Sequence, residues 1–376
     1  MNTKHTFITL ALAASTLTLT CCNGSSKQPA ATDEVQEQVQ SSLKADEAIN
    51  RAINFYAGIS KDGISISDTD AKAWDAYSAT IKGFIERSAP TLKMVEGIAS
   101  SDFADFRDSI DYVFYPFSGA DFIYPYTLFP NAKTYFLCGI EKTGSPIDKD
   151  IVTSFSQYET YRQALATYFR TSYFASKEMA ADWGTMEVDG ICPVITMLMA
   201  ISKCEIISIK YKDIDRSGAI VDTADKRKLL EIRFFRTGSQ QEQTLYYFSS
   251  NVADKSFDAH LKAYLEDTLP DHKVGTYMKA ASFLLHNDFF SMMRNCILDN
   301  SDVIVQDDSG IPYRHLTDKF TVNLYGEYVK PSEEFPEECH QADLQQRYHD
   351  DAAAIKPLPC RIGYNSPSNW IVARRK

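Results

Sequence analysis

The sequence predicts an α+β fold in which a helical N-terminal lobe packs with an antiparallel β-meander and flanking helices. Apolar residues recur at intervals of three and four over most of the first half of the chain. From Cys204 onward the pattern changes to short runs rich in β-branched and aromatic residues. No repeat or linker separates the halves. We therefore expect one domain over residues 44–376, with a helical lobe over 44–203 and a mixed β/α lobe over 204–376.

The individual elements follow from the same spacing, taken in chain order. Helical periodicity predicts helices over residues 44–58, 71–95, 154–183 and 192–203. Short β-rich runs with polar connections predict a three-stranded antiparallel meander over residues 205–211, 228–236 and 244–249. A helix over 254–266, with Asp254 capping its first turn, follows the meander. Residues 276–298 are expected to form one long helix or two, and 303–306, 320–325 and 361–364 are expected as further strands.

The first 21 residues have the pattern of an export signal. Residues 1–6 carry Lys4 and His5 and no acid, and residues 7–20 are uncharged and mostly apolar. The apolar run is shorter than the roughly 20 residues that a helix needs to cross a bilayer, so we expect it to target the chain without remaining as a span. Elsewhere the richest apolar stretch, residues 191–201, is also too short.

The segment Leu19-Thr20-Cys21-Cys22 resembles the lipobox of bacterial lipoproteins, in which a cysteine is acylated and becomes the new N-terminus. Leu19 stands three positions before Cys22, whereas lipidation of Cys21 would place Thr18 at that aliphatic position. The alternative is an ordinary secretory signal with two incidental cysteines. The resemblance implies a lipid bilayer partner through acylated Cys22, and Asn23, which replaces the aspartate of inner-membrane retention, favours the outer membrane.

Composition limits the partners of the exported chain. Residues 22–43 are polar and lack aromatic side chains, which predicts a disordered tether. The formal net charge is −11, and cleavage before Cys22 removes the positive charge of Lys4, leaving −12. Nucleic acid and anionic headgroups are therefore poor electrostatic partners. A glycan or an envelope protein remains a possible partner, and no cofactor is expected.

Six cysteines follow Cys22 and, in an oxidising compartment, allow three disulfides in 15 pairings. We expect Cys339 to pair with Cys360, since both lie in the less regular C-terminal region. Buried free thiols are an equally good interpretation of the cysteines that lie in apolar sequence, Cys138, Cys192 and Cys296.

The most unusual segment, residues 112–136, contains ten aromatic residues interrupted by Pro116, Gly119, Pro125 and Pro130. These breaks predict that much of the segment is loop or turn. One interpretation is a ligand platform, with Tyr115, Phe117, Tyr124 and Tyr126 as the binding candidates. The other, which we favour, is a loop pinned into the core by its rings. Asp121 is the catalytic candidate here, because burial beside rings would raise its pKa.

A second candidate site is the polar turn over residues 306–315. It collects two acids, a hydroxyl, a guanidinium and an imidazole, a set that suits acid/base or nucleophilic chemistry if the groups converge. The catalytic candidates are Asp307, Asp308, Ser309, Arg314 and His315, together with His286 if that residue reaches the turn. The alternatives are an ordinary Asp-Ser-Gly turn and a histidine that is satisfied at a helix C-terminus.

The remaining motifs give little evidence of a functional site. Residues 213–220 look like the start of a calcium-binding EF-hand loop, but Ala224 stands where the bidentate glutamate belongs, so a hairpin loop is the better interpretation and no metal site is expected. The sequence has no Gly-x-Ser-x-Gly elbow, His-Glu-x-x-His motif, phosphate loop or dinucleotide fingerprint.

Two segments, residues 114–119 and 307–312, are similar to segments of uncharacterised exported bacterial proteins, a resemblance that implies no activity and no catalytic residue. Two hypotheses follow. The first is a non-catalytic envelope lipoprotein that binds a ligand or partner through the aromatic segment. The second is an exported hydrolase acting on glycans with Asp121 and the acids of the Asp307 turn, which requires their carboxylates within ~5 to 10 Å of each other.

Overall fold

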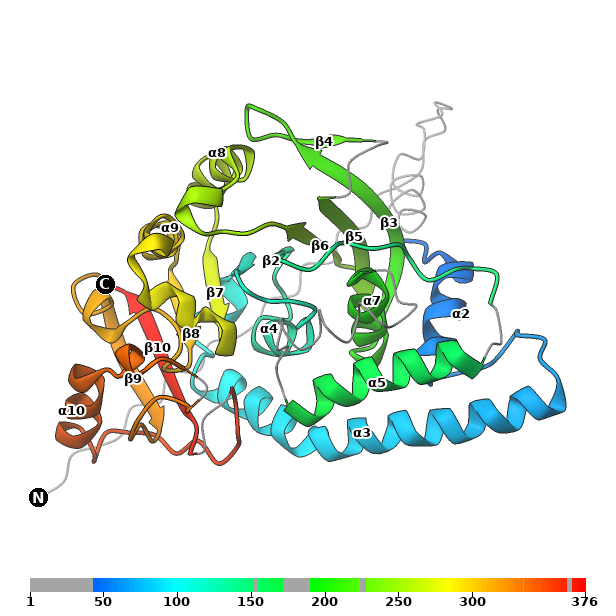
Figure 1. Cartoon of the computed structure of the whole chain (residues 1–376), viewed down its shortest axis with the longest axis horizontal. Coiled ribbons are helices and arrows are strands. Elements are labelled where there is room, and N and C mark those ends of the chain that lie inside the picture. The colour runs from blue at the N-terminus through cyan, green and yellow to red at the C-terminus, as the bar shows by residue number, and fades with distance from the viewer. Residues whose placement is uncertain (1–42, 152–154, 172–189, 224–227, 334, 364–366) are drawn as a thin grey trace, which may run out of the picture. The chain divides into compact units, whose positions relative to one another are not determined.

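A ten-stranded mixed sheet forms the centre of the molecule and confirms the predicted α+β class (Figure 1). The computed structural model describes residues 43–151, 155–171, 190–223, 228–333, 335–363 and 367–376. The strand order is β4-β3-β5-β6-β2-β1-β7-β8-β10-β9. Leu43–Lys376 forms one compact unit, in which strands from both sides of residue 203 share this sheet.

The five central strands are parallel. They pair in the order β6-β2-β1-β7-β8, with Tyr112 of β1 opposite Thr134 of β2 on one side and Val274 of β7 on the other. Their bounds are Glu242–Ser249 (β6), Thr134–Gly139 (β2), Tyr112–Tyr115 (β1), Val274–Met278 (β7) and Val303–Gln306 (β8). Because parallel strands end at the same edge of a sheet, five loops meet at their carboxyl ends.

Antiparallel strands extend the sheet at both sides. The predicted three-stranded meander is confirmed as β3 (Cys204–Ile214), β5 (Leu229–Arg236) and β6, and β4 (Ile220–Asp222) forms a hairpin with β3. The hairpin loop contains Asp215, whose carboxylate accepts hydrogen bonds within the turn, so the hairpin interpretation of the EF-hand-like segment holds. At the other side β10 (Asn369–Arg375) lies antiparallel between β8 and β9 (Phe320–Gly326).

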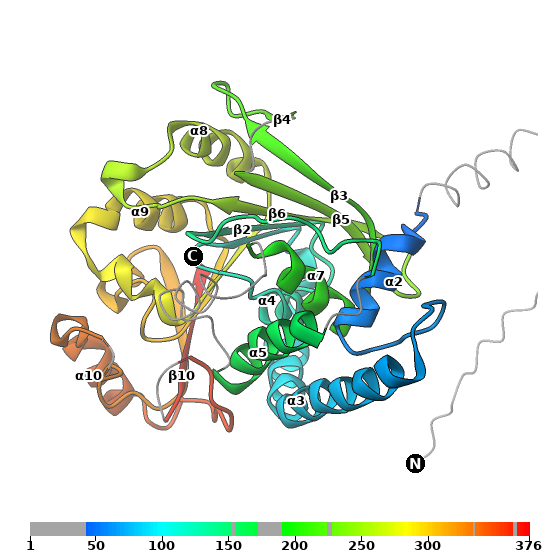
Figure 2. The same ribbon diagram turned by 45° about the vertical axis from the view of Figure 1, so that its right-hand side comes forward.

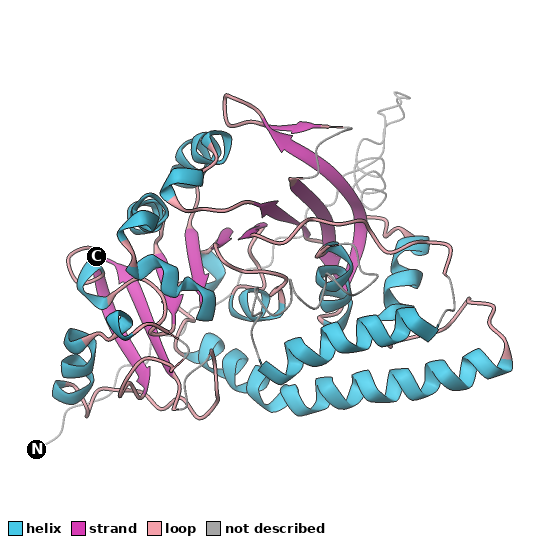
Figure 3. Cartoon of the chain, viewed as in Figure 1, coloured by secondary structure: helices cyan, strands magenta, loops and turns pink. Residues whose placement is uncertain are grey.

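Helices cover both faces of the sheet, and each face has its own hydrophobic core (Figures 2 and 3). One face packs against α2 (Glu47–Tyr56), α3 (Asp68–Ser101), α4 (Ile123–Leu128), α5 (Phe155–Thr171) and α7 (Cys192–Ile201). The other packs against α8 (Ala259–Thr268), α9 (Ser291–Asn300) and α10 (Ala342–Asp350). Short 3₁₀ helices span Arg107–Ser109, Asp254–Ser256, Leu269–Asp271, Ala280–His286, Asp288–Phe290, Tyr313–His315 and Glu337–Cys339.

The capping residues explain where several helices begin. The Asp46 side chain accepts hydrogen bonds from the first turn of α2, and Ser67 caps α3 in the same way. The predicted cap at Asp254 is wrong in detail. Asp258 caps α8, whereas the Asp254 carboxylate accepts hydrogen bonds from the Ser291 and Met292 amides and so fixes the start of α9.

Residues 112–136 form β1, α4 and the first half of β2, joined by turns over residues 116–122 and 129–133, so much of the segment is turn, as predicted. Two further predictions are corrected by the structure. The first part of the expected helix over 276–298 belongs to β7, and the expected strand over 361–364 is not formed by residues 361–363. Central parallel strands are buried on both faces, so β1, β7 and β8 lack the alternation that identifies a strand in sequence.

The cysteines that follow Cys22 are all free thiols, so the predicted disulfide between Cys339 and Cys360 is wrong. Cys360 contributes to the core on the α3 and α5 face, whereas Cys339 ends a 3₁₀ helix. The predicted export signal, the predicted lipidation site Cys22 and all but the last residue of the predicted tether lie outside the described residues, as does the end of the helix predicted over 154–183. None of the helices in the described part of the chain is both long and apolar enough to cross a membrane.

Candidate functional site

The loops after β1 and β7 diverge at the carboxyl edge of the parallel strands. The chain leaves β1 toward β2 through α4 on one face, and leaves β7 toward β8 through α9 on the other. A crevice where neighbouring strands send their connections in opposite directions is the usual ligand site of open α/β sheets. Both loops adopt left-handed backbone at the second residue after the strand, with φ of +63° at Phe117 and +61° at Ala280. Such strain in residues other than glycine is concentrated at functional sites.

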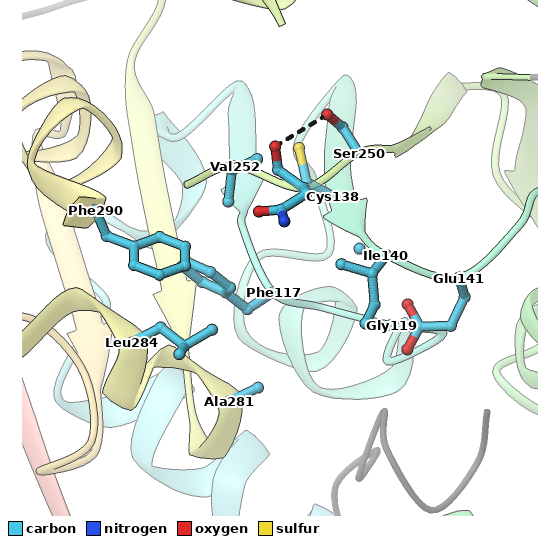
Figure 4. A pocket seen from close by; sticks show the side chains of 12 residues that line it. Phe117, Gly119, Cys138, Ile140, Glu141, Ser250, Val252, Ala281, Leu284 and Phe290 are labelled. Carbon is cyan, nitrogen blue, oxygen red and sulfur yellow. Dashed lines mark hydrogen bonds between the residues drawn. The ribbon is translucent and has the colours of Figure 1, made fainter. Parts of the chain in front are cut away.

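A pocket of about 230 Å³ opens at this edge (Figure 4). Its walls come from the loops after β1, β2, β6 and β7 and from the segment that precedes α9. One end is apolar, where the rings of Phe117 and Phe290 lie 5.8 Å apart beside Leu284. The carboxylate of Glu141 lies at the opposite end. The remaining described lining residues are Gly119, Cys138, Gly139, Ile140, Ser250, Asn251, Val252 and Ala281.

Glu141, the second residue after β2, is held in a defined position. The Tyr247 hydroxyl donates to Glu141 Oε2 at 3.0 Å and is also 3.0 Å from the Glu141 carbonyl oxygen. Gly139 is required for this arrangement, because a Cβ atom there would lie 2.5 Å from both Glu141 Oε2 and the Tyr247 hydroxyl. Burial raises the pKa of Glu141 above its ordinary value, and the Tyr247 hydrogen bond opposes that rise. The carboxylate retains acceptor capacity beyond this bond.

A buried ion pair joins the loops on either side of the crevice. Lys279 Nζ lies 3.0 Å from Asp121 Oδ2, and both side chains are 1% exposed. The Lys279 ammonium also lies 3.5 Å from the centroid of the Tyr124 ring. Asp121 accepts hydrogen bonds from the hydroxyls of Tyr115 at 3.2 Å and Tyr168 at 2.9 Å. Burial lowers the pKa of Lys279, and the Asp121 carboxylate opposes that shift. The pair therefore links the β1 and β7 loops beneath the crevice.

The Asp307 turn lies at the same edge of the sheet, but its Asp307 and Ser309 side chains are buried and hydrogen-bonded to one another and to the backbone. The Asp307 carboxylate accepts hydrogen bonds from the Ser309 amide and hydroxyl and from the Ala280 amide. The Ser309 hydroxyl lies 3.0 Å from that of Ser282. Burial and the neighbouring Asp308 carboxylate raise the pKa of Asp307. Asp307 acts electrostatically on Lys279, so the structure brings the two predicted acidic segments together.

The other catalytic candidates do not converge on an open site. The Asp308 carboxylate accepts a hydrogen bond of 2.8 Å from the Asn369 amide, and Asp307, Asp308 and Ser309 are at most 3% exposed. Arg314 is exposed and His315 is half-buried. Burial and the charges of Arg294 and Arg314 lower the pKa of His315.

His286 does reach the Asp307 turn, as the sequence analysis allowed. The backbone of Asp308 and Gly310 faces its imidazole, and burial lowers the pKa of His286 to about 4. Its Nε2 atom is buried without a hydrogen-bond partner among the described residues. A neutral imidazole packed against a turn fits a structural role better than proton transfer at an open site.

Of the four aromatic candidates, one lines the pocket and the other three are buried in the protein. Phe117 lines the pocket, whereas Tyr115 and Tyr124 surround the Asp121–Lys279 pair. Tyr126 stacks on Phe122 within the core, with ring centroids 4.8 Å apart. The favoured interpretation, a segment pinned into the core by its rings, therefore describes most of residues 112–136, and Phe117 is the exception.

Sequence reasoning missed Lys279, Glu141 and Tyr247. Lys279 follows a run that resembles the start of a helix, so its place at the end of a central strand was not recognised. Glu141 carried one usable signal: it is the first acidic residue after the apolar run of residues 134–140, about 20 residues beyond Gly119. No local pattern indicated the hydrogen bond from Tyr247, which joins β6 to the end of β2.

No protein-family model, curated protein or solved structure matches this chain.

Proposed function

We propose that this protein is a lipid-anchored protein of the bacterial cell envelope that binds a small organic molecule in the pocket between Phe290 and Glu141. The single observation that carries the binding proposal is the position of this pocket, at the point where the connections of β1 and β7 diverge. An apolar wall facing a fixed polar group is also the usual composition of small-molecule sites.

Exposed apolar side chains at the rim of the pocket also support the binding of a ligand. Ile140, at the mouth, is 60% exposed, and Phe289, whose ring lies 5.2 Å from that of Phe290, is 54% exposed. Exposed apolar side chains beside a concave site are common where a ligand or partner covers them. The volume of about 230 Å³ lies slightly below the ~300 to 1,000 Å³ of drug-sized pockets, which favours a small molecule over a polymer.

The envelope location rests on the sequence. The short apolar run and the lipobox-like segment support acylation of Cys22, and three acyl chains would hold the protein firmly, since one chain alone gives marginal binding. Asn23 favours the outer membrane. The acidic composition supports a partner other than nucleic acid.

A glycan hydrolase that uses Asp121 and the acids of the Asp307 turn has less support. Such an enzyme needs carboxylates that reach a glycosidic bond and a water molecule. Asp121 is paired with Lys279, while Asp307 and Asp308 are committed to hydrogen bonds with the backbone and with Asn369. A polymeric sugar would have to displace these buried contacts before reaching the carboxylates.

The binding proposal is tested by filling the pocket. Ala281 is a half-buried lining residue, and Ala281→Trp places an indole in the cavity, whereas Ala342→Trp adds the same group on the exposed side of α10. Full-length protein extracted in mild detergent is examined by native mass spectrometry for a retained small molecule and by thermal shift against a library of small metabolites.

We expect the wild-type protein and Ala342→Trp to bind the same compound and Ala281→Trp to lose it. Unchanged binding by Ala281→Trp contradicts the assignment of the pocket. Wild-type protein that retains no compound and gains stability from none in the library contradicts the binding function itself.

A further inference from the structure

The charge of the pocket narrows the class of ligand. Among its described lining residues there is one acid, Glu141, and no lysine, arginine or histidine. The loop after β1 contains a single glycine, Gly119, in place of the glycine-rich pattern that brings backbone amides to a pyrophosphate. A phosphate group in this pocket would meet the Glu141 carboxylate and no cation among the described lining residues. The described lining therefore disfavours anionic ligands such as nucleotides and dinucleotides.

The position of Glu141 in the sheet is one at which a carboxylate recognises ribose hydroxyls in other proteins. In doubly wound sheets, a carboxylate about 20 residues beyond the glycine of the first loop accepts hydrogen bonds from ribose hydroxyls. Glu141 stands at about this distance from Gly119, as the second residue after β2, and Figure 4 shows its carboxylate directed toward the Gly119 loop. Tyr247 fixes one carboxylate oxygen while leaving acceptor sites free, so two neighbouring hydroxyls can donate to one rigid group.

The opposite end of the pocket suits a flat, apolar group. The Phe117 and Phe290 rings lie there, tilted by 59°, with Leu284 beside them. Nucleobases stack on aromatic side chains because every base presents a π-face. Gly119 lies between the two ends, where the absence of a side chain leaves room for the ligand.

We infer that the ligand is an uncharged ribonucleoside, with the vicinal diol of its ribose on Glu141 and its base against Phe117 and Phe290. This inference rests on the proposed binding function and specifies the class of molecule bound. The limited volume admits one nucleoside and excludes a nucleic-acid strand, in agreement with the acidic composition of the chain.

The inference is tested by calorimetric titration of the full-length protein in detergent with adenosine, guanosine, cytidine and uridine, each also as its 2′-deoxy and 5′-monophosphate form. At least one ribonucleoside is expected to bind. Its 2′-deoxy form is expected to bind at least about tenfold more weakly, because a hydrogen bond to a charged acceptor is lost. The monophosphate is also expected to bind more weakly.

The matched variants are Glu141→Gln, which preserves the size of the side chain, and Glu86→Gln on the exposed face of α3. Glu141→Gln is expected to lower the affinity for the ribonucleoside to that for its deoxy form, while Glu86→Gln keeps the wild-type ratio of the two affinities. The ratio of ribonucleoside affinity to deoxynucleoside affinity separates recognition of the diol from a purely structural role of Glu141. Loss of a structural role would weaken binding of both forms alike. Circular dichroism checks that both variants are folded.

Each negative outcome has a separate meaning. Equal affinity for ribo and deoxy forms, or an unchanged ratio in Glu141→Gln, overturns the role of Glu141. Failure of all four ribonucleosides overturns the ligand class. In that case a different compound displaced by Ala281→Trp would leave the proposed binding function standing, so the two failures are distinguishable.

Discussion

Lys279, directly after β7, and Asp121, in the loop after β1, form an ion pair of 3.0 Å in which both side chains are 1% exposed. The pair lies beneath the crevice at the carboxyl edge of the sheet and ties together the two loops that border it. Its geometry is supported by two tyrosine hydroxyls on the carboxylate and by the Tyr124 ring against the ammonium. These contacts hold the two loops in fixed positions at the edge of the crevice.

Breaking this pair from one side is expected to be costly. Lys279→Met or Asp121→Asn leaves an unpaired buried group and should lower the free energy of unfolding by about 3 to 5 kcal/mol in urea titrations. The double variant should lose much less than the sum of the two, because neither charge is then left unpaired. Additive losses would contradict direct coupling. The exposed pair Lys330–Glu333 is the control, and Glu333→Gln should cause no measurable change.

The catalytic candidates Asp121 and Asp308 are both buried and engaged in hydrogen bonds. Replacing the two together is therefore expected to destabilise the fold, because buried hydrogen-bond partners are left unsatisfied.

The left-handed backbone at Ala280 predicts opposite responses to two small substitutions. Ala280→Gly removes the ~1 to 2 kcal/mol cost of this conformation for an L-residue, offset by the ~0.5 to 1 kcal/mol of added chain entropy, so stability should stay level or rise slightly. Ala280→Val should lower stability by about 1 to 3 kcal/mol, since β-branching disfavours this backbone. Thermal or urea unfolding measures both, and equal losses would contradict the conformational argument.

His286 predicts a loss of stability in mild acid. Its pKa falls from 6.5 to about 4 in the folded state because the imidazole is buried. Between these values the unfolded chain binds the proton and the native state does not, so stability falls as pH decreases from 6.5 toward 4. The loss attributable to this residue is at most about 3 kcal/mol.

The measurement is urea unfolding of wild type and His286→Gln at pH 7 and pH 4. The wild type should lose more stability than the variant over this interval. Replacement of the exposed His349 by Gln should leave the wild-type dependence unchanged. An identical pH dependence for wild type and His286→Gln would show that the pKa of His286 is the same in the folded and unfolded states and would contradict the effect of burial.

The proposed acylation of Cys22 predicts the cell fraction in which each cysteine variant is found. Cys22→Ala should move the protein from the membrane fraction to the soluble fraction of disrupted cells, because the anchor is lost. Cys21→Ala preserves Leu19 three positions before Cys22 and should remain with the membrane. Membrane association that survives Cys22→Ala would exclude this anchor.

Particular residues show how far the sequence predicts the structure. The meander of β3, β5 and β6 was predicted within a few residues, because its strands are partly exposed and separated by polar turns. Val303–Gln306 was also recognised, since turn residues follow it closely. The strands around Phe114 and Tyr277 were missed because burial on both faces removes the period-two pattern.

The candidate site was harder to predict for a related reason. Asp121 and Asp307 were catalytic candidates from the sequence, and the structure places both at the carboxyl edge of the sheet. The polar group that faces the pocket is Glu141, whose place depends on the parallel pairing of β1, β2 and β6 and on a hydrogen bond from Tyr247. Pairings between distant segments determine such a site, and local periodicity does not contain them.

A crystal structure of the protein with the compound that it retains or binds most tightly tests the proposed binding site most directly. We expect one small molecule between the Phe117 and Phe290 rings and the Glu141 carboxylate, close to the backbone of Gly119. A compound bound elsewhere on the chain, with this pocket filled by rearranged side chains, would contradict this expectation.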